Sequence, residues 1–287
     1  MYQNVKMKPM NRIKLIIGPT AIGKSDYAID LAKQSNAHII SADAFQVYKG
    51  MDIGTGKISP VQQAIVPHHL IDIKEPNQPY NAAEFVRLAN QLIESISSPI
   101  IICGGTGMYI NALLNNYTFQ PPSSTVNAKE IVSSIKSQDL WKTLNKIDPQ
   151  TASSIHKNNH IRLQRALEIW YSSQTKPSVY NEQRTQRSDI TIIGLISNRH
   201  SIRDRISNRI DRMINDGLFD EVHQLIQRYD KNGHAFQAIG YKQIIQYLDN
   251  KLTKEQAIEL IKVKSYQFAK RQLTWFRKFH SIDWISV

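Results

Sequence analysis

The sequence predicts an α/β fold, a parallel sheet flanked by helices, and two observations support this prediction. Three short isoleucine-rich runs, 13–17, 38–42 and 99–103, each lead directly into Gly or Asp. Amphipathic segments at 25–35 and 82–96, with apolar residues at helical spacing, separate these runs. Strands that alternate with helices pair in parallel, because each helix returns the chain to the edge where the next strand begins.

Later segments extend this pattern and interrupt it. The runs 70–73 and 190–196 are predicted as further strands. From 128 to 171 the apolar periodicity is helical throughout, after a Pro-Pro-Ser-Ser turn at 121–124, and 172–188 is polar and rich in turn residues. We therefore expect an all-helical insertion at 121–187 within one core formed by 1–120 and 188–287. The core should end in a helical C-terminal region, with helices at 202–216, 218–229, 241–249 and 254–279.

The composition excludes several classes of protein. Among 287 residues there is one cysteine, Cys103, which excludes an internal disulfide framework and a cysteine-based zinc site. The first ten residues lack the apolar core of a signal peptide, and no run approaches the roughly 18 apolar residues that span a membrane. We therefore expect a cytoplasmic protein without membrane association. The net charge of +12, from 36 Lys and Arg against 24 Asp and Glu, favours a polyanionic partner.

A phosphate-binding loop follows the first predicted strand and opens the first predicted helix. Its sequence, Gly18-Pro19-Thr20-Ala21-Ile22-Gly23-Lys24-Ser25, matches the pattern G-x-x-x-x-G-K-[ST]. The glycines let the backbone curl so that several N–H groups face one oxyanion, and the helix N-terminus adds partial positive charge. Lys24 supplies a full charge, and the Ser25 hydroxyl can hold Mg²⁺. The loop predicts a P-loop NTPase-like sheet that binds a diphosphate or triphosphate group.

The rest of the expected site does not match an enzyme that hydrolyses a nucleoside triphosphate. In such enzymes a second apolar strand ends in an Asp that holds the metal ion. Here the run 100–103 ends in Gly104-Gly105-Thr106-Gly107 instead. Asp43 and Asp72 each end a predicted strand, so the possibility that one of them holds the metal ion from a different strand stays open. The pattern argues against hydrolysis and ordinary kinase chemistry without excluding them.

Asp43 is the main candidate for proton transfer. It ends the strand that follows the phosphate loop, and in parallel sheets ligands bind outside the carboxyl ends of the strands. Gly18–Ser25, Asp43 and Gly104–Thr106 should therefore converge on one crevice, where a carboxylate can accept a proton from an attacking nucleophile. The alternative is that Asp43 caps the N-terminus of a following helix.

Taken together, these segments resemble the tRNA dimethylallyltransferase family, also called tRNA isopentenyltransferases, in its bacterial form without a zinc finger. The most specific matches are Gln46–Thr55 and Arg271–Arg277. Ala44, Gly56 and the pair Asn159-His160 depart from the family pattern, and Ala44 lacks a hydroxyl that could contact RNA. The remaining matches follow the family order over nearly the whole chain: Gly18–Ser25, Ser41–Phe45, Pro67–Asp72, Gly104–Tyr109, Arg162–Glu168, Arg205–Met213 and Ala238–Lys242.

The resemblance implies a prenyl transfer reaction. The family moves a dimethylallyl group from dimethylallyl diphosphate to N6 of the adenosine at position 37, beside the anticodon, in tRNAs that read codons beginning with U. It implies that Gly18–Ser25 bind the diphosphate, with Thr20 adding a hydroxyl and Ser25 holding Mg²⁺. Lys24 and one arginine of the 205–213 segment would stabilise the charge on the departing diphosphate.

The resemblance also implies roles for residues around the acceptor base. Either Arg205 or Arg209 is the arginine that meets the diphosphate, and the sequence does not choose between them. Asp43 would orient the adenine amine and take its proton. Thr106 would hydrogen-bond near the reaction centre. The target base must leave its stack to reach the crevice.

Contacts with the tRNA anticodon stem-loop are expected from four segments. Both 129–187 and 251–287 carry a clear excess of basic over acidic side chains, and basic side chains fit phosphates. For any single basic residue, a solvated helix face is the alternative. A monomer is expected, because the enzyme grips one RNA hairpin. The residues that the resemblance assigns to tRNA are Asp43, Ala44, Phe45 and Gln46; Arg162, Gln164 and Arg165; Gly240, Tyr241 and Lys242; and Lys270, Arg271 and Arg277.

Three other functions stay open from the sequence. An adenylate isopentenyltransferase would use free AMP and would have no use for the basic segments. A small-molecule kinase would use the same phosphate loop and would need a metal-holding Asp at a strand end. A non-catalytic RNA-binding module would need neither the phosphate loop nor Asp43.

Overall fold

The computed structural model describes residues 12–119, 128–182 and 185–287 and divides the chain into two compact units. One unit joins Met1–Ala112 to Ser188–Val287, and the other is Leu113–Arg187. The first ten residues and the turn predicted at 121–124 lie outside the described residues. No helix in the described ranges is long and apolar enough to span a membrane.

The first unit contains a six-stranded sheet in the order β3-β2-β4-β1-β5-β6, and all its pairs are parallel, so the predicted fold class is confirmed. Central strands are almost wholly buried, which explains their unbroken isoleucine runs. The strands are β1 Ile13–Ile17, β2 His38–Ser41, β3 His68–His69, β4 Ile100–Cys103, β5 Ile190–Ile196 and β6 Ile282–Ser286.

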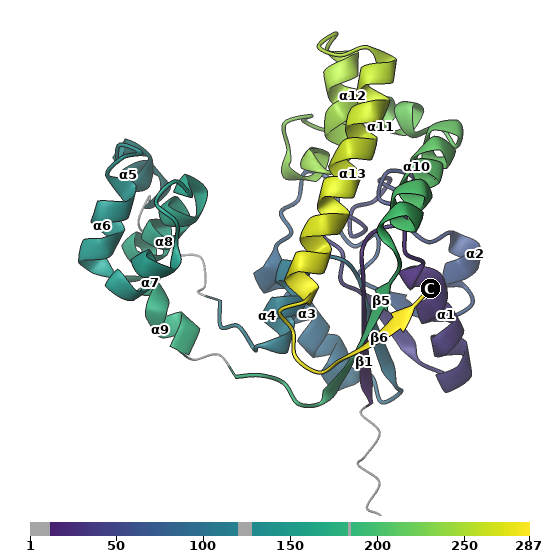
Figure 1. The fold of residues 1–287 in the computed structure, drawn as a ribbon, viewed down its shortest axis with the longest axis horizontal. Coiled ribbons are helices and arrows are strands. Elements are labelled where there is room, and N and C mark those ends of the chain that lie inside the picture. Colours follow the sequence, from purple (N-terminus) through teal and green to yellow (C-terminus); the bar gives the residue numbers. More distant parts are fainter. Residues whose placement is uncertain (1–11, 120–127, 183–184) are drawn as a thin grey trace, which may run out of the picture. The chain divides into compact units, whose positions relative to one another are not determined.

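Helices flank this sheet and stand beyond the carboxyl ends of its strands (Figure 1). Helices α10 and α13 pack against each other, and α11 and α12 lie beside them. The helices of this unit are α1 Lys24–Ser35, α2 Pro60–Gln63, α3 Ala82–Ser95, α4 Gly107–Leu114, α10 Arg199–Asn215, α11 Leu218–Ile226, the 3₁₀ helix η1 His234–Gln237, α12 Tyr241–Leu248 and α13 Lys254–Phe276.

Two strand predictions need correction. The run 70–73 is not a strand, because Leu70 and Asp72 have φ angles of 61° and 55° and turn the chain. Strand β3 is instead the short pair His68–His69, so Asp72 ends no strand; its carboxylate accepts a hydrogen bond from Lys57 Nζ at 2.5 Å. Strand β6 was not predicted, since three of its five residues are exposed and its apolar run is weak.

The second unit is a bundle of short helices around its own core. Leu140, Leu144, Leu163 and Leu167 are fully buried at its centre. The buried carboxylate of Asp148 accepts hydrogen bonds from Thr151 and from Ser178 N, which ties two helices together. The helices are α5 Ala128–Ser134, α6 Leu140–Ile147, α7 Pro149–Ser154, α8 His160–Ser173 and α9 Pro177–Glu182.

The bounds of this unit differ from the expected insertion in two ways. It begins at Leu113 rather than at 121, because the segments entering and leaving it pair with each other: Arg187 N donates to Leu114 O, and Asn116 Nδ2 donates to Thr185 O. Helix α9 lies inside 172–188, which the sequence indicated as turns.

Candidate functional site

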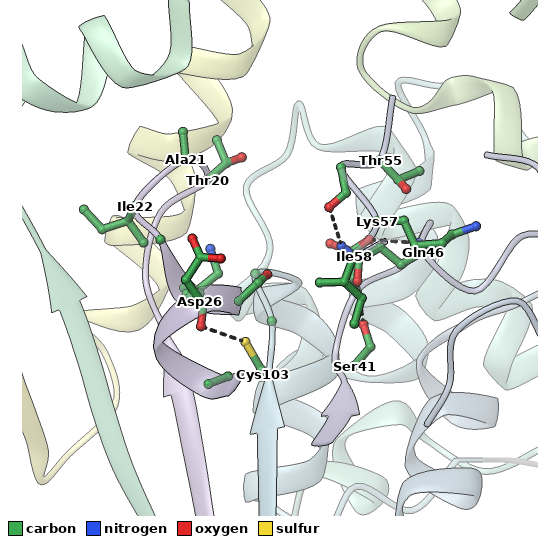
Figure 2. Close-up of a pocket in the computed structure, with 18 of the residues that line it drawn as sticks. Thr20, Ala21, Ile22, Asp26, Ser41, Gln46, Thr55, Lys57, Ile58 and Cys103 are labelled. Carbon is green, nitrogen blue, oxygen red and sulfur yellow. Dashed lines mark hydrogen bonds between the residues drawn. The ribbon is translucent and has the colours of Figure 1, made fainter. Parts of the chain in front are cut away.

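The phosphate loop joins β1 to α1 at the carboxyl end of the sheet. Gly23 has φ 95° and directly precedes the first residue of α1, a left-handed conformation that favours glycine. Gly23 and Ser25 line a cavity of about 250 Å³, which we call the phosphate cavity. In Figure 2 the labelled loop residues Thr20, Ala21 and Ile22 lie on one side of this cavity, and the labelled residues Thr55, Lys57 and Ile58 lie opposite them. The sequence prediction of this loop and its helix is therefore matched by its geometry.

Lys24 folds over its own loop. Its Nζ donates to Pro19 O at 2.8 Å and lines the phosphate cavity. Removal from water lowers the pKa of Lys24 to about 8, with a further lowering from the nearby positive charge of Arg209. A phosphate group entering the cavity would favour the charged amine and oppose this shift.

Asp43 follows β2 and caps a turn with one carboxylate oxygen. Its Oδ1 accepts from Phe45 N at 2.9 Å and from Gln46 N at 3.3 Å. The residues after it form a turn and no helix, so the helix-cap alternative is wrong in its original form. Its Oδ2 has no hydrogen-bond partner within the described residues, and Asp43 lines both cavities of the site. Oδ1 can therefore hold the turn while Oδ2 stays available to accept a proton.

Thr106 ties the glycine loop that follows β4 to the Asp43 turn. Its Oγ1 accepts from Ala44 N at 3.1 Å, and its backbone N donates to Ala42 O at 3.3 Å. Gly104, Thr106 and Asp43 therefore meet at one point, as the sequence predicted. The Thr106 side chain lines the second cavity rather than the phosphate cavity.

The second cavity, which we call the apolar cavity, has a volume of about 460 Å³ and adjoins the phosphate cavity. The two cavities share eight lining residues: Thr20, Ala21, Asp43, Thr55, Gly105, Arg209, Phe268 and Gln272. The remaining wall of the apolar cavity is mostly hydrophobic and includes Met108, Ile206, Ile210, Met213, Leu218, Ile239, Ile261 and Trp275. A charged site thus opens directly into a hydrophobic one.

The structure separates the two candidate arginines of α10. Arg209 lines both cavities, and its Nη2 lies 3.5 Å from Thr55 O. Arg205 is exposed, lines neither cavity and lies 3.5 Å from Ile22 O on the phosphate loop. Of the two, Arg209 has the better position to meet an anion in the phosphate cavity.

The residues predicted to contact tRNA fall into three groups. Ala44, Phe45, Gly240 and Arg271 line the apolar cavity, while Gln46 lines the phosphate cavity. Exposed charged residues lie elsewhere: Lys242 at the start of α12, and Arg162 and Arg165 on α8 of the second unit, where Gln164 is half-buried. Lys270 and Arg277 line a separate groove with Arg199 on the outer side of α13.

Tyr241 requires a correction. Its side chain is fully buried and its hydroxyl donates to Glu221 Oε1 at 2.5 Å, so the side chain cannot contact RNA. Burial raises the pKa of Tyr241, and the Glu221 carboxylate raises it further. Tyr241 lies on the buried face of α12 together with Ile244 and Ile245. The motif resemblance assigned the segment to RNA without indicating which of its side chains are buried.

Sequence reasoning missed two residues that hold the site together. Glu221 on α11 accepts hydrogen bonds from the backbone N–H groups of Asp52, Ile53 and Gly54, next to Thr55. Gln272 on α13 bonds both the phosphate loop and the glycine loop. Gln272 belongs to a specific sequence motif, but its partners are far away in sequence, so only the tertiary structure identifies its contacts.

Comparison with known proteins gives concordant results. A family model described as IPP transferase matches residues 46–279, and one described as isopentenyl transferase matches 11–68. A protein of Carboxydothermus hydrogenoformans named tRNA dimethylallyltransferase is 44% identical, with 95% of this chain and 91% of that protein covered. A protein of the same name from Anoxybacillus flavithermus is 41% identical, with 96% and 90% covered.

Two solved structures are also similar. The tRNA isopentenylpyrophosphate transferase of Bacillus halodurans has a TM-score of 0.72 at 38% identity, with 96% of this chain and 90% of that chain covered. A eukaryotic dimethylallyltransferase acting on tRNA has a TM-score of 0.85 at 30% identity, with 96% and 73% covered. The similarity extends over nearly the whole of the chain.

Proposed function

The chain belongs to the IPP transferase family, and we propose on that premise that it is a tRNA dimethylallyltransferase. In the proposed reaction, a dimethylallyl group passes from dimethylallyl diphosphate to N6 of the adenosine at position 37, 3′ to the anticodon. The products are N6-dimethylallyladenosine and diphosphate, and the substrates are tRNAs that read codons beginning with U. We propose that the reaction takes place in the cytoplasm, where tRNA substrates are present.

One observation carries the proposal: a cationic phosphate cavity opens directly into an apolar cavity, with Asp43 at the junction. Dimethylallyl diphosphate has the same division, an anionic head and a five-carbon hydrocarbon tail. The diphosphate fits the phosphate loop, and the tail fits the hydrophobic wall that includes Met108, Ile210 and Trp275. The apolar wall also keeps water away from the allylic carbon.

The leaving diphosphate needs positive charge as the allylic carbon–oxygen bond breaks. Lys24 and Arg209 both line the phosphate cavity, so each can stabilise developing negative charge there. Arg205 lies outside both cavities and is a weaker candidate. Mutation of a comparable single donor costs on the order of 10²–10³ in rate in other enzymes.

We propose that Mg²⁺ binds in the phosphate cavity together with the diphosphate substrate. Ser25 lines the phosphate cavity, but the described residues contain no group of three or more His, Cys, Asp or Glu side chains placed to hold a metal. The ion would therefore be held by the Ser25 hydroxyl, substrate phosphate oxygens and water, as Mg²⁺ commonly is. Once bound, it would neutralise part of the charge on the departing diphosphate.

Asp43 is the proposed acceptor of the N6 proton. Its Oδ1 is held by two backbone N–H groups, which fixes the carboxylate and leaves Oδ2 for the amine. Adenine N6 is a poor nucleophile, so the position of the amine matters as much as the basicity of Asp43. Thr106 supports this arrangement through the Ala44 N–H.

The tRNA anticodon stem-loop is the proposed macromolecular partner of a monomeric enzyme. Residues 44–46, Gly240 and Arg271 border the cavities, where the flipped base would enter. The exposed side chains Arg162, Arg165 and Lys242, with Lys270 and Arg277, are proposed to contact phosphates. The half-buried Gln164 and the backbone of 241 complete the segments assigned to RNA.

One assay separates this function from its alternatives. The protein is incubated with labelled dimethylallyl diphosphate and Mg²⁺, and in turn with unmodified tRNA carrying A36-A37-A38, with AMP, and with ATP together with small-molecule acceptors typical of kinases. We expect label in the tRNA, and none in a tRNA with G at position 37. Label in AMP but not in tRNA would identify an adenylate isopentenyltransferase. Phosphorylation of small acceptors by ATP without any prenyl transfer would identify a kinase.

A further inference from the structure

Gln272 is a buried polar side chain between two loops of the site. Only 4% of the residue is exposed, although it lies on α13 within a segment that the sequence assigned to RNA contact. Its Oε1 accepts from Thr20 N at 2.8 Å, and its Nε2 donates to Gly105 O at 2.9 Å. A single side-chain amide therefore joins the phosphate loop to the glycine loop after β4.

The two partners of Gln272, the N–H of Thr20 and the carbonyl of Gly105, require a side chain that both accepts and donates. A backbone N–H can only donate and a carbonyl can only accept, so an amide is the uncharged side-chain group that satisfies both at this distance. Both bonds are within the normal range for N–H···O hydrogen bonds. Leaving a buried backbone N–H and carbonyl without partners is costly, so a residue that breaks the bridge lets the loops move apart.

Glycines in the loop after β4 allow α13 to pack close to the loop backbone. A Cβ added at Gly105 would lie 2.2 Å from Gln272 Nε2, and one at Gly107 would lie 3.0 Å from the Trp275 ring. The glycines at these two positions therefore permit the close approach of α13, in addition to any contact with a ligand. Two motifs separated by more than 150 residues are thus fitted to each other.

The bridge connects the two groups that the reaction must align. On one side, Thr20 belongs to the loop proposed to hold the diphosphate. On the other, Gly105 precedes Thr106, whose Oγ1 accepts from Ala44 N beside Asp43. Because Gln272 already occupies the Thr20 N–H, the diphosphate must be bound by the remaining N–H groups of the loop and by Lys24.

We propose that Gln272 is a positioning residue for the transfer reaction, which sets the spacing between the diphosphate on the phosphate loop and the adenine amine at Asp43. This inference rests on the proposed function. It assigns Gln272 to the alignment of the substrates rather than to RNA contact. Small misplacements of reacting groups cost on the order of 10²-fold in rate, so the alignment has a measurable effect.

The main test is Gln272→Met, which keeps the length of the side chain and removes both hydrogen bonds. We expect kcat to fall by about tenfold to a hundredfold. The KM for dimethylallyl diphosphate should stay within about threefold, because Lys24 and the other loop N–H groups remain. The Kd for tRNA should not change, since the side chain is buried. A residue that only supports the fold would lower the melting temperature without this split between kcat and KM.

A second variant, Gln272→Glu, tests the same bridge with a different signature. Its carboxylate can still accept from Thr20 N but repels the Gly105 carbonyl and brings negative charge beside the phosphate loop. We expect both a lower kcat and a KM for dimethylallyl diphosphate raised by about tenfold or more. The glutamate variant also decides the question if the methionine variant does not fold.

Gln267→Met is the matched control, because it makes the same substitution at an exposed position of α13. It should behave as the wild type in all three measurements. The inference is overturned if Gln272→Met retains kcat within twofold, or if its kcat recovers fully at a temperature well below its melting point. Absence of transfer by the wild-type protein would instead overturn the proposed function.

Discussion

The two faces of α13 differ in burial, in partners and in the kind of residue they carry. On the inner face, Gln272 is buried between two loops and Trp275 lines the apolar cavity. On the outer face, Lys270 and Arg277 are exposed and line a groove with Arg199. Arg271 is exposed at the edge of the inner face, where it borders the apolar cavity.

This difference shows that one continuous motif contributes residues to two separate surfaces. Residues in direct succession point to different sides of a helix, since each step turns the direction by about 100°. The resemblance assigned Lys270, Arg271 and Arg277 to RNA as one set, whereas the structure separates Arg271 from the other two. Changes on the inner side should alter the chemical step, and changes on the outer side should alter RNA affinity alone.

The largest effect is expected at Asp43, which lines both cavities. Replacement by Asn keeps an oxygen that can accept from Phe45 N and Gln46 N but removes the base. We expect Asp43→Asn to lower kcat by about 10²–10⁴-fold, the usual contribution of a general base. Transfer is measured with labelled dimethylallyl diphosphate, and tRNA binding by filter retention.

Asp43→Ala provides the comparison, because it also loses the turn contacts and should be at least as impaired. Both variants should bind tRNA almost as well as the wild type. A near wild-type rate in Asp43→Asn would rule out Asp43 as the proton acceptor.

The next largest effect distinguishes the two arginines of α10. Arg209→Ala should reduce kcat by about 10²-fold, because it removes positive charge from both cavities. Arg205→Ala should cost less than about threefold, because Arg205 is exposed and its contact with Ile22 O is long. Single-turnover rates at saturating substrate measure both. Equal losses in the two variants would contradict the assignment from cavity position.

The pH dependence of diphosphate binding should reveal Lys24. Its pKa in the free protein is lowered to about 8, so the amine is charged below that pH and loses its proton above it. Relative to Lys24→Arg, which stays charged, the affinity of the wild type for the diphosphate should therefore be constant below pH 8 and fall by up to about tenfold per pH unit above it. Titration calorimetry with Mg²⁺ and inorganic diphosphate from pH 6.5 to 9.5 measures this. Lys24→Arg should retain only the pH dependence that comes from the ionisation of the diphosphate itself.

The smallest effect is expected on the outer face of α13. Removal of both charges in Lys270→Ala/Arg277→Ala should weaken tRNA binding several-fold and reduce the slope of log K against log salt by about 2. The value of kcat at saturating tRNA should not change. Lys33→Ala on α1, also an exposed lysine, is the control. An unchanged salt slope would remove this groove from the RNA interface.

Most of the first unit could be predicted from local patterns. The isoleucine runs identified β1, β2, β4 and β5, because strands buried on both faces need continuous apolar residues. The predicted helices of the C-terminal region agreed with the structure to within a few residues at each end. Strand β6 was not predicted because it lies at the sheet edge and three of its five residues are exposed.

The candidate site was predictable only in part. The phosphate loop and Asp43 are recognisable because their function depends on the local order of residues along the chain. Glu221 and Gln272 were not, because their role depends on partners more than 150 residues away. Tyr241 was misassigned for a different reason: the motif resemblance was followed although the side chain lies on the buried face of α12 and bonds to Glu221 on α11.

By itself, the sequence determined the parallel sheet, the phosphate loop at its carboxyl edge and the carboxylate that follows the second strand. These features arise from the spacing of residues that are close in the chain. Only the tertiary structure decided which arginine lines the cavities, which side of α13 each basic residue occupies, and that Gln272 joins two site loops. The physical reason is that these properties depend on contacts between distant segments, which form only when α10 and α13 pack beyond the sheet.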